Sequence, residues 1–406
     1  MLSETENNIL QTLESLLSDT GALREGDAIP IKSWDEFHSD ASNIACYTNN
    51  STIIPLSLRY CNLATLPESL NQLTNLQRLD VTGNQLATLP ESLGNLHHLQ
   101  ALHADANLLT SLPESLGNLS QLRAIHADAN HLTMFPVQLC QLHQLETLRI
   151  YKNELTSLPE NIALLTQLKD FSVGHNRLTS LPESLWQLTN LQTLNIAENQ
   201  LTELSEHIGY LTHLRMLDAG HNKLTTLPAS LGDLTNLTSF LYLSNNHLTT
   251  LPESLFENLP NLTYLNITDN GLTALPESIG KLISLKELRL YNNAFTTLPA
   301  TLGNLAKLKE LHIMNNKLVT LPESLGNLAS LTHLDLRNNQ LSMIPQSLGN
   351  LNNLRHLDLR ANRLVALPVS IGNLPQLEKL DVRWNKLRAI PAWFEELEQR
   401  GCAILL

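Results

Sequence analysis

The stretch LQRLDVTGNQLATLPESLGNL, residues 76–96, carries the pattern that decides the fold. Aliphatic residues stand at 76, 79, 81, 86, 89, 93 and 96, with asparagine at 84 and proline at 90. The same order starts again at Leu99, and versions of it occur fifteen times from about Ile53 to the C-terminal end. A repeat this regular predicts a stack of similar units, each of which buries its leucines only against its neighbours.

The asparagine gives the register of the repeat. Cys61 takes its place in the first unit, and successive asparagines are 23 residues apart except for two steps of 24. One extra residue lies near Thr238–Phe240 and the other within Leu255–Leu259. These residues, called the ladder asparagines below, are Asn84, Asn107, Asn130, Asn153, Asn176, Asn199, Asn222, Asn246, Asn270, Asn293, Asn316, Asn339, Asn362 and Asn385.

The two halves of the unit predict different structures. Apolar and polar residues alternate around Leu79 and Val81, which is typical of a half-buried strand. The side-chain amide of Asn84 is expected to bond backbone groups of adjacent turns where the strand ends. In the other half, Pro90 suits the start of a short helical turn. Gly94 is expected to interrupt any long helix, so we predict tight outer turns.

The pattern L-x-x-L-x-L-x-x-N/C-x-L resembles that of the leucine-rich-repeat family over roughly 85% of the chain. The LPESLGNL half is similar to the bacterial and Ras-scaffold type of repeat. The resemblance implies an α/β solenoid, a right-handed horseshoe with a parallel concave sheet and short 3₁₀ or α outer turns. We expect an N-terminal helical cap at 1–52, fifteen repeats at 53–392 and a C-terminal cap at 393–406.

Composition excludes several classes of protein. The formal net charge of −13 argues against nucleic-acid binding, which needs a basic surface. The chain contains no apolar run long enough to span a membrane, and its start lacks the regions of a signal peptide. We therefore expect a cytoplasmic protein, or one secreted into a host cell by a route without an N-terminal signal. The cysteines lack metal-site spacing, and free thiols or one Cys46–Cys61 bridge are the alternatives.

The variable strand residues are where a partner would bind in this fold. They stand four and two places before each ladder asparagine. Two nearly identical strands, LHADAN and IHADAN, place two His–Asp pairs side by side. Histidine and carboxylate can bind a divalent metal, but a repeat duplication that leaves a solvated polar ladder is the simpler explanation. We call these residues the His–Asp patch: His103, Asp105, His126 and Asp128.

A second group combines tyrosine and arginine, the residue types that carry binding energy at interfaces. Small residues at positions 174, 197, 220 and 244 leave room for an inserted side chain. The alternative is that exposed strand positions favour tyrosine anyway. We predict partner binding at this Tyr/Arg centre, which comprises Arg149, Tyr151, Phe240, Tyr242, Tyr264, Arg289, Tyr291 and Met314.

The last three repeats align a column of aspartates beside a column of arginines. The two columns can pair across strands as a self-satisfied ladder. They can instead form a docking patch in which arginine contacts carboxylate or phosphate groups of a partner. This Asp/Arg end comprises Asp335, Arg337, Asp358, Arg360, Asp381, Arg383 and Trp384.

The sequence as a whole indicates a monomeric, non-enzymatic module that binds a protein partner on its concave face and needs no cofactor. A bacterial effector or a signalling scaffold are the settings that the resemblance suggests. We find no phosphate loop, nucleophile elbow or paired acid and base. The alternatives are the recognition component of a ubiquitin-ligase-like or other enzyme assembly, and a structural, self-assembling solenoid.

Overall fold

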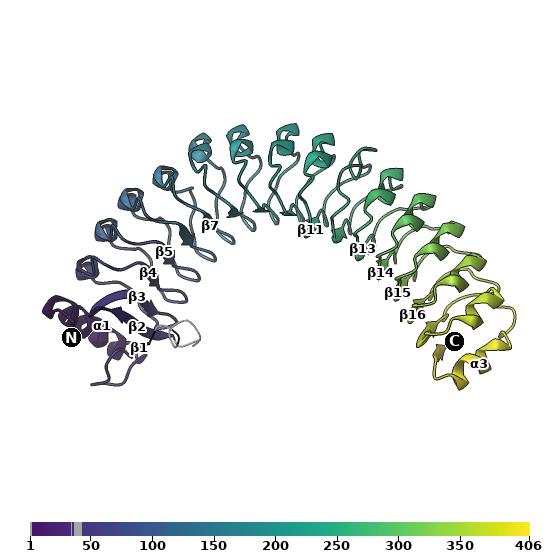
Figure 1. Cartoon of the computed structure of the whole chain (residues 1–406), viewed down its shortest axis with the longest axis horizontal. Helices are drawn as coiled ribbons and strands as arrows, with labels where there is room; N and C mark the ends of the chain where they lie inside the picture. The colour runs from purple at the N-terminus through teal and green to yellow at the C-terminus, as the bar shows by residue number, and fades with distance from the viewer. Residues whose placement is uncertain (1, 34, 36–42) are drawn as a thin grey trace. The chain divides into compact units, whose positions relative to one another are not determined.

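A computed structural model describes residues 2–33, 35 and 43–406. The chain divides into two units, Met1–Asn199 and Gln200–Leu406. In each of them the strands line the inner edge and short helical turns line the outer edge (Figure 1). The predicted solenoid with a parallel sheet and 3₁₀ outer turns is confirmed in both units.

The first unit begins with a cap. Helix α1 starts with a capping box, in which Ser3 Oγ accepts the N–H of Glu6 while the Glu6 carboxylate accepts the N–H of Ser3. Glu6 also accepts the N–H of Ile53, so the helix is tied to the start of β3. Strands β2 and β3 pair antiparallel, and all later pairs of this unit are parallel. Its elements are α1 (Glu4–Asp19), β1 (Ile31–Lys32), β2 (Ile44–Asn49), β3 (Thr52–Leu58), η1 (Glu68–Gln72), β4 (Arg78–Asp80), η2 (Glu91–Asn95), β5 (Ala101–His103), η3 (Glu114–Asn118), β6 (Ala124–His126), η4 (Val137–Gln141), β7 (Thr147–Arg149), η5 (Glu160–Leu164), β8 (Asp170–Ser172), η6 (Glu183–Gln187) and β9 (Thr193–Asn195).

The second unit is parallel throughout and ends in a short helix and strand. Helix α3 buries Trp393, Phe394 and Leu397, and β18 pairs with β17. Its elements are η7 (Glu206–Tyr210), β10 (Met216–Asp218), η8 (Ala229–Asp233), β11 (Phe240–Tyr242), β12 (Tyr264–Asn266), η9 (Glu277–Lys281), β13 (Glu287–Arg289), η10 (Ala300–Asn304), β14 (Glu310–His312), η11 (Glu323–Asn327), β15 (His333–Asp335), η12 (Gln346–Asn350), β16 (His356–Asp358), η13 (Val369–Asn373), β17 (Lys379–Asp381), α3 (Trp393–Gln399) and β18 (Ala403–Leu405).

The ladder asparagines bond the backbone as predicted. Asn130 Oδ1 accepts the N–H of Leu109 at 3.0 Å, while its Nδ2 donates to the carbonyl of Ala104 at 3.0 Å and to that of Ala127 at 3.2 Å. One side chain therefore joins its own repeat to the preceding one. Because these backbone groups are buried, the amide replaces water as their partner.

The outer turns differ from expectation in the role of glycine. A Cβ built on Gly94 would lie 2.6 Å from the carbonyl oxygen of Ser115 in the next turn. Glycine is thus required because adjacent turns approach closely, and not only to shorten a helix. The glutamates after proline also act between repeats: the Glu91 carboxylate accepts the N–H groups of Glu114 and Ser115 at 3.2 and 3.1 Å. Those backbone bonds lower the pKa of Glu91.

The residue before each ladder asparagine adopts the left-handed conformation. Gly83 has a φ of 72°, yet Ala106, Ala129 and Ala361 occupy the same position with φ of 51–53°. Glycine, asparagine and aspartate tolerate this region far better than other residues. The repeat therefore contains a strained backbone position that its consensus letters do not reveal.

The remaining predictions have mixed outcomes. The extra residue within Leu255–Leu259 leaves residues 253–258 as turns without a 3₁₀ helix, while Phe256 is buried. Part of the N-terminal cap predicted at 1–52, namely residues 1, 34 and 36–42, lies outside the described residues. All four cysteines are buried free thiols, and burial raises the pKa of Cys46 to about 12. Within the described residues, no helix is long and apolar enough to cross a membrane.

Candidate functional site

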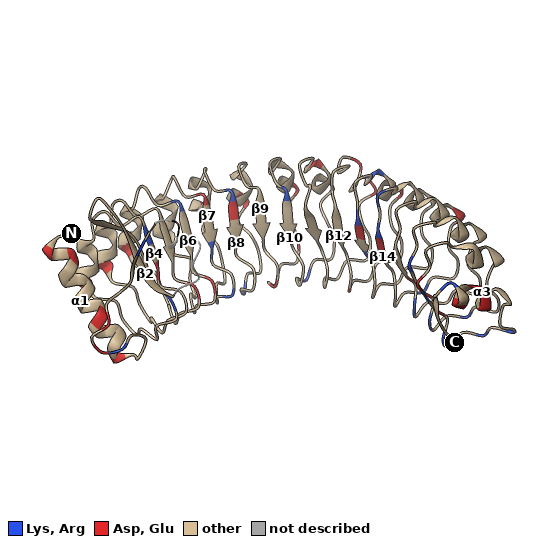
Figure 2. Cartoon of the chain, turned by 60° about the horizontal axis from the view of Figure 1, so that its bottom comes forward, with Lys and Arg blue, Asp and Glu red and all other residues tan. Residues whose placement is uncertain are grey.

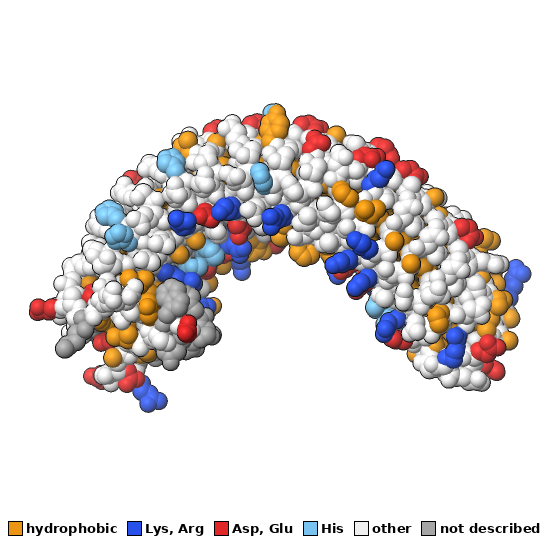
Figure 3. All heavy atoms as spheres, in the orientation of Figure 1, with side chains coloured by type: hydrophobic (Ala, Val, Ile, Leu, Met, Phe, Trp, Pro, Cys, Tyr) orange, Lys and Arg blue, Asp and Glu red, His pale blue; other side chains and the backbone are white. Residues whose placement is uncertain are grey.

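The exposed side of the strands, called the sheet face here, presents the variable side chains. Leucines such as Leu102 point into the core, so their strand neighbours point outward. Acidic and basic residues both occur on these strands, for example on β7 and β8 (Figure 2). Histidine, basic and acidic side chains are likewise interspersed on the surface visible in Figure 3.

The structure brings the His–Asp patch together on β5 and β6. The strand register aligns His103 with His126, and their ring centroids lie 4.4 Å apart with the planes at 48°. Asp105 Oδ1 accepts the N–H of Asp128 at 2.7 Å, and Asp128 Oδ1 accepts the N–H of Tyr151 at the same distance. Each aspartate therefore has one oxygen engaged by the next repeat.

Partial burial controls the charge of the His–Asp patch. Burial lowers the pKa of His103 to about 4, with the charge of Arg78 adding to the effect, and it lowers the pKa of His126 as well. It raises the pKa of Asp128 to about 6. The two imidazoles are consequently neutral at pH 7, the form in which histidine binds metals.

Three groups of this patch are near enough to share an ion. His103, Asp105 and His126 each offer a ligand atom, and these atoms all lie within 4.8 Å of one another. Asp128 is not part of this group. Glu287, Glu310 and His312 form a similar group that the sequence prediction missed, since Glu287 and Glu310 stand six places before their ladder asparagines, whereas the columns of charged residues it compared stand four and two places before.

The Tyr/Arg centre is distributed over both units. In the first, Arg149 donates from Nε and Nη2 to Asp170 at 3.1 and 2.6 Å. The Tyr151 hydroxyl donates to Glu198 at 2.7 Å, and its ring lies beside that of His175 at 5.6 Å. Both residues are therefore engaged with neighbouring side chains of the first unit.

In the second unit, three rings form what we call the aromatic cluster: Phe240, Tyr242 and Tyr264. The Phe240 ring lies 5.8 Å from that of Tyr242 and 5.5 Å from that of Tyr264, and the two tyrosine rings are 5.0 Å apart. The guanidinium of Arg289 lies 5.6 Å from the centroid of Tyr264. Phe240 remains 39% exposed.

Neighbouring residues extend this surface. Arg289 Nε donates to Glu287 at 2.5 Å, which leaves its other nitrogens available for further contacts. Tyr291 lies on the same repeat as Arg289 and Met314 on the following one, and both are half-buried. Burial raises the pKa of Tyr264 to about 12 and also raises that of Tyr242, so both phenols remain neutral donors at physiological pH.

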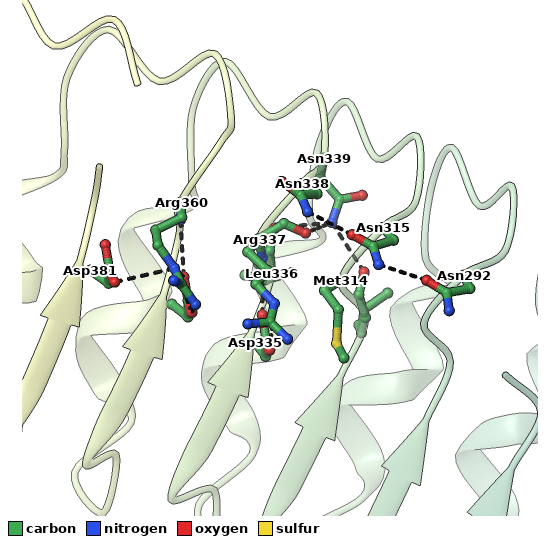
Figure 4. A network of polar contacts seen from close by, with 12 residues as sticks. Asn292, Met314, Asn315, Asp335, Leu336, Arg337, Asn338, Asn339, Arg360 and Asp381 are labelled. Carbon is green, nitrogen blue, oxygen red and sulfur yellow. Dashed lines mark hydrogen bonds and ion pairs between the residues drawn. The ribbon is translucent and has the colours of Figure 1, made fainter. Parts of the chain in front are cut away.

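The sequence suggested that the Asp/Arg end pairs across strands. In the structure, its ion pairs form mainly within one strand. Arg360 Nη2 lies 2.5 Å from Asp358 of its own strand, and Arg383 Nη2 lies 2.7 Å from Asp381. Among the described residues of this Asp/Arg end, the one pair across strands is Arg360 Nε with Asp381 at 3.2 Å (Figure 4). Pairs within one repeat predominate because residues two apart along a strand share a face.

Arg337 and Trp384 complete this end of the sheet face. Arg337 Nε lies 3.4 Å from Asp335 of its own strand. Trp384 is 71% exposed, and the Arg383 guanidinium lies 5.4 Å from its ring centroid. The arginines are thus already neutralised, which favours the self-satisfied ladder over a strongly basic patch.

Two features of the second unit escaped the sequence prediction. Asn315 Nδ2 donates to Asn292 at 2.6 Å, and Asn338 Nδ2 donates to Asn315 at 2.7 Å, forming a chain of amides (Figure 4). A separate hollow of about 170 Å³ lies along strands β14 to β17, and three of its lining residues stand six places before their ladder asparagines. Its lining is His312, His333, Leu334, Asp335, His356, Leu357, Asp358 and Lys379.

Known proteins share this repeat. Residues 55–131 and 241–355 match a model described as a leucine-rich repeat region, and residues 143–201 and 189–241 match a leucine-rich repeat model, as do residues 353–374. A leucine-rich-repeat protein of Leptospira interrogans is 33% identical, with a TM-score of 0.79, over 86% of this chain and 94% of that one. No curated protein matches the chain.

Two further structures are similar. The plant peptide hormone receptor RGFR1, solved in complex with RGF2, is 27% identical over 84% of this chain and 64% of that one, with a TM-score of 0.66. The internalin InlF of Listeria monocytogenes is 24% identical over 88% of this chain and 97% of that one, with a TM-score of 0.69. The internalin supports the fold alone.

Proposed function

Because the chain belongs to the leucine-rich-repeat proteins, we propose that it binds a protein partner on its sheet face. Proteins with this fold are generally non-enzymatic interaction modules. The observation that carries the proposal is the aromatic cluster of Phe240, Tyr242 and Tyr264, with Arg289 over one of its rings. These residues are the types that dominate binding energy at interfaces.

The packing of the aromatic cluster favours binding. Its rings support one another at 5.0–5.8 Å, so little side-chain freedom remains to be lost when a partner docks. Tyr242 and Tyr264 are only half-buried, and Phe240 is more than one-third exposed. The neutral phenols of Tyr242 and Tyr264 can donate hydrogen bonds without the desolvation penalty of a charge.

The surrounding residues would select the partner. Tyr291 and Met314 continue the surface with adaptable apolar contacts. Arg337, Arg360 and Arg383 are paired with aspartates, so we expect them to orient a partner more than to add affinity. Trp384 offers a second exposed ring. In the first unit, Arg149 and Tyr151 would form a separate contact.

A related protein supports a polypeptide partner. The plant receptor RGFR1 is a peptide hormone receptor and was solved in complex with RGF2. Over 84% of its length, this chain is 27% identical in sequence to that receptor. A segment of polypeptide is therefore the class of partner that we propose.

The test begins with a photo-crosslinking phenylalanine analogue at position 240 of the full chain. Crosslinked proteins from candidate cell lysates are identified, and the affinity of the purified partner is then measured. We expect Tyr242→Ala with Tyr264→Ala to weaken binding by about 10- to 100-fold, since each hot-spot truncation removes more than about 1 kcal/mol.

Tyr210 provides a matched control. It is an exposed tyrosine on the outer turn η7, so Tyr210→Ala should leave the affinity unchanged. Equal affinity of the wild type and the double variant would contradict the assignment of the aromatic cluster. Crosslinks between two copies of the chain would instead favour the self-assembling solenoid, and crosslinks to a ubiquitin ligase would favour the recognition component of an enzyme assembly.

We further propose that the protein acts as a bacterial effector or signalling scaffold inside a reducing cytosol. A relative from Leptospira interrogans at 33% identity supports a bacterial setting. The four buried free thiols support a reducing compartment. Fractionation of producing cells, medium and host cells for a reporter fusion tests this, and recovery from the medium alone would contradict it.

A further inference from the structure

The His–Asp patch contains donor atoms that the protein-binding proposal does not use. His103 and His126 lie on adjacent strands of the first unit, and the free oxygen of Asp105 lies beside them. We propose that His103, Asp105 and His126 bind a single zinc ion on the sheet face. This site is independent of the aromatic cluster, which lies in the second unit.

The two imidazoles are available as ligands. Within the part of the chain that the structure describes, neither the His103 nor the His126 imidazole forms a hydrogen bond or an ion pair, and both residues are half-buried. Their ring nitrogens are not among the fully buried side-chain atoms without a partner, so they are open to solvent and to an ion. A bound ion would take one nitrogen from each ring.

The backbone already holds the third ligand in place. Asp105 Oδ1 accepts the N–H of Asp128, so the carboxylate is fixed while its second oxygen remains available. Such hydrogen bonds to a ligating carboxylate orient it and are a common feature of metal sites. The site therefore has an anchored carboxylate between two strand-held imidazoles.

Small side-chain rotations would close the site. The three ligand atoms lie within 4.8 Å of one another, whereas ligands about 2.1 Å from a tetrahedral zinc are separated by about 3.4 Å. Rotation of the imidazoles about their χ torsions can cover this difference without moving the strands. Three protein ligands leave one position open, as in many accessible zinc sites.

The donor types favour zinc over magnesium or calcium, which prefer oxygen ligands alone. The local charges are mixed. The positive charge of Arg78 acts against a cation at His103, as its lowering of the pKa of that imidazole shows. Arg59 and Arg78 lie 3.9 and 3.7 Å from Asp80, and Arg149 pairs with Asp170, so carboxylates compensate the nearby arginines in part.

Two other histidine clusters in the chain are less suitable and serve as comparisons. His312 Nε2 already contacts Glu310 at 3.1 Å, and Glu287 already contacts Arg289. The rings of His333 and His356 are also 4.4 Å apart. Among the described residues, however, no third ligand atom joins this pair in a group whose atoms all lie within 4.8 Å of one another.

The experiment uses the full chain without a histidine tag, freed of metal with EDTA and then dialysed. Calorimetric titration with zinc chloride should give one ion per chain. Cobalt chloride should give visible absorption bands of tetrahedral cobalt. His103→Ala with His126→Ala should abolish both signals, and Asp105→Asn should weaken zinc binding by about 10- to 100-fold.

The matched control is His333→Ala with His356→Ala, which removes a histidine pair of equal spacing and should leave zinc binding unchanged. Circular dichroism in EDTA verifies that each variant is folded. A wild-type Kd weaker than about 1 mM would overturn the proposal. Zinc binding that survives in the His103/His126 variant, or that is unaffected by Asp105→Asn, would overturn it as well.

Discussion

Arg360 joins two neighbouring strands through Asp381: its Nε lies 3.2 Å from a carboxylate that is 0% exposed. Burial alone would raise the pKa of Asp381, but hydrogen bonds from Arg383 and the charges of Arg360 and Arg383 outweigh it and hold the pKa below its usual value. A buried carboxylate is thus kept ionised by two arginines, only one of which belongs to its own strand.

We expect Arg360→Met to destabilise the fold by about 1.5–3 kcal/mol, because Asp381 loses one of its charged partners. Urea denaturation at pH 7 measures this. Because the folded pKa of Asp381 is depressed, its contribution is present above the unfolded pKa and is lost as pH falls through the folded pKa. The difference between the variant and the wild type should therefore shrink below about pH 4; a difference independent of pH would contradict this account.

The ladder asparagine Asn130 can be tested directly. Asn130→Ala leaves the N–H of Leu109 and the carbonyl of Ala104 without partners, so we expect a loss of about 1–3 kcal/mol. Asn130→Cys places in this repeat the residue that the first repeat has at Cys61. The thiol is a weak donor and acceptor, so it should restore little of the lost stability. Thermal denaturation of both variants compares them, and a cysteine variant as stable as the wild type would be contrary to expectation.

Gly326 should not accept a side chain. A Cβ there would lie 2.6 Å from Ser347 Cβ and 2.7 Å from its carbonyl carbon, so neighbouring outer turns would have to separate. Gly326→Ala should therefore lower stability by about 1–3 kcal/mol. Gly271→Ala is the control, because its nearest contact would be 3.4 Å away. Similar unfolding midpoints for the two variants would show that the turns can move apart easily.

Replacement of Ala361 by glycine is expected to stabilise the protein, whereas replacement of Gly326 by alanine destabilises it. It has a φ of 51°, a conformation that disfavours a Cβ by about 1–2 kcal/mol. Ala361→Gly should stabilise the protein by about 0.5–1 kcal/mol, even though glycine also increases the entropy of the unfolded chain. Ala219→Gly, at a buried position without a positive φ, should destabilise it. Denaturant midpoints of both variants give the answer, and a loss of stability for Ala361→Gly would rule out strain at this position.

Asp128 should make the first unit less stable as the pH rises. Its folded pKa is raised to about 6, chiefly by burial, so the folded state binds more protons than the unfolded state between about pH 4 and 6. Asp128→Asn retains an oxygen that can accept the N–H of Tyr151 and removes the cost of ionisation. We expect a higher Tm than the wild type at pH 7.5 and no difference near pH 4, measured in EDTA. An equal change in Tm at both pH values would contradict the raised pKa of Asp128.

Particular residues show how far sequence reasoning reached. The contacts of Asn130, the inward position of Leu102 and the turn at Pro90 follow from the letters of one repeat, because each repeat meets only its neighbours at a fixed spacing. Phe240, Tyr242 and Tyr264 were all predicted as members of the Tyr/Arg centre, whereas their packing against one another is visible only in the structure. The group of Glu287, Glu310 and His312 was not predicted.

The sequence by itself determined which residues share a strand, a column and a face, because the spacing of 23 residues sets all three. Only the tertiary structure decided with which partner each side chain forms an ion pair or a hydrogen bond. Arg360 reaches Asp358 on its own strand and Asp381 on the next. Strands about 4.8 Å apart offer a long side chain several partners at similar distances, so local packing and burial make the choice. The same packing sets the close approach at Gly94 and leaves His103 and His126 available as ligands.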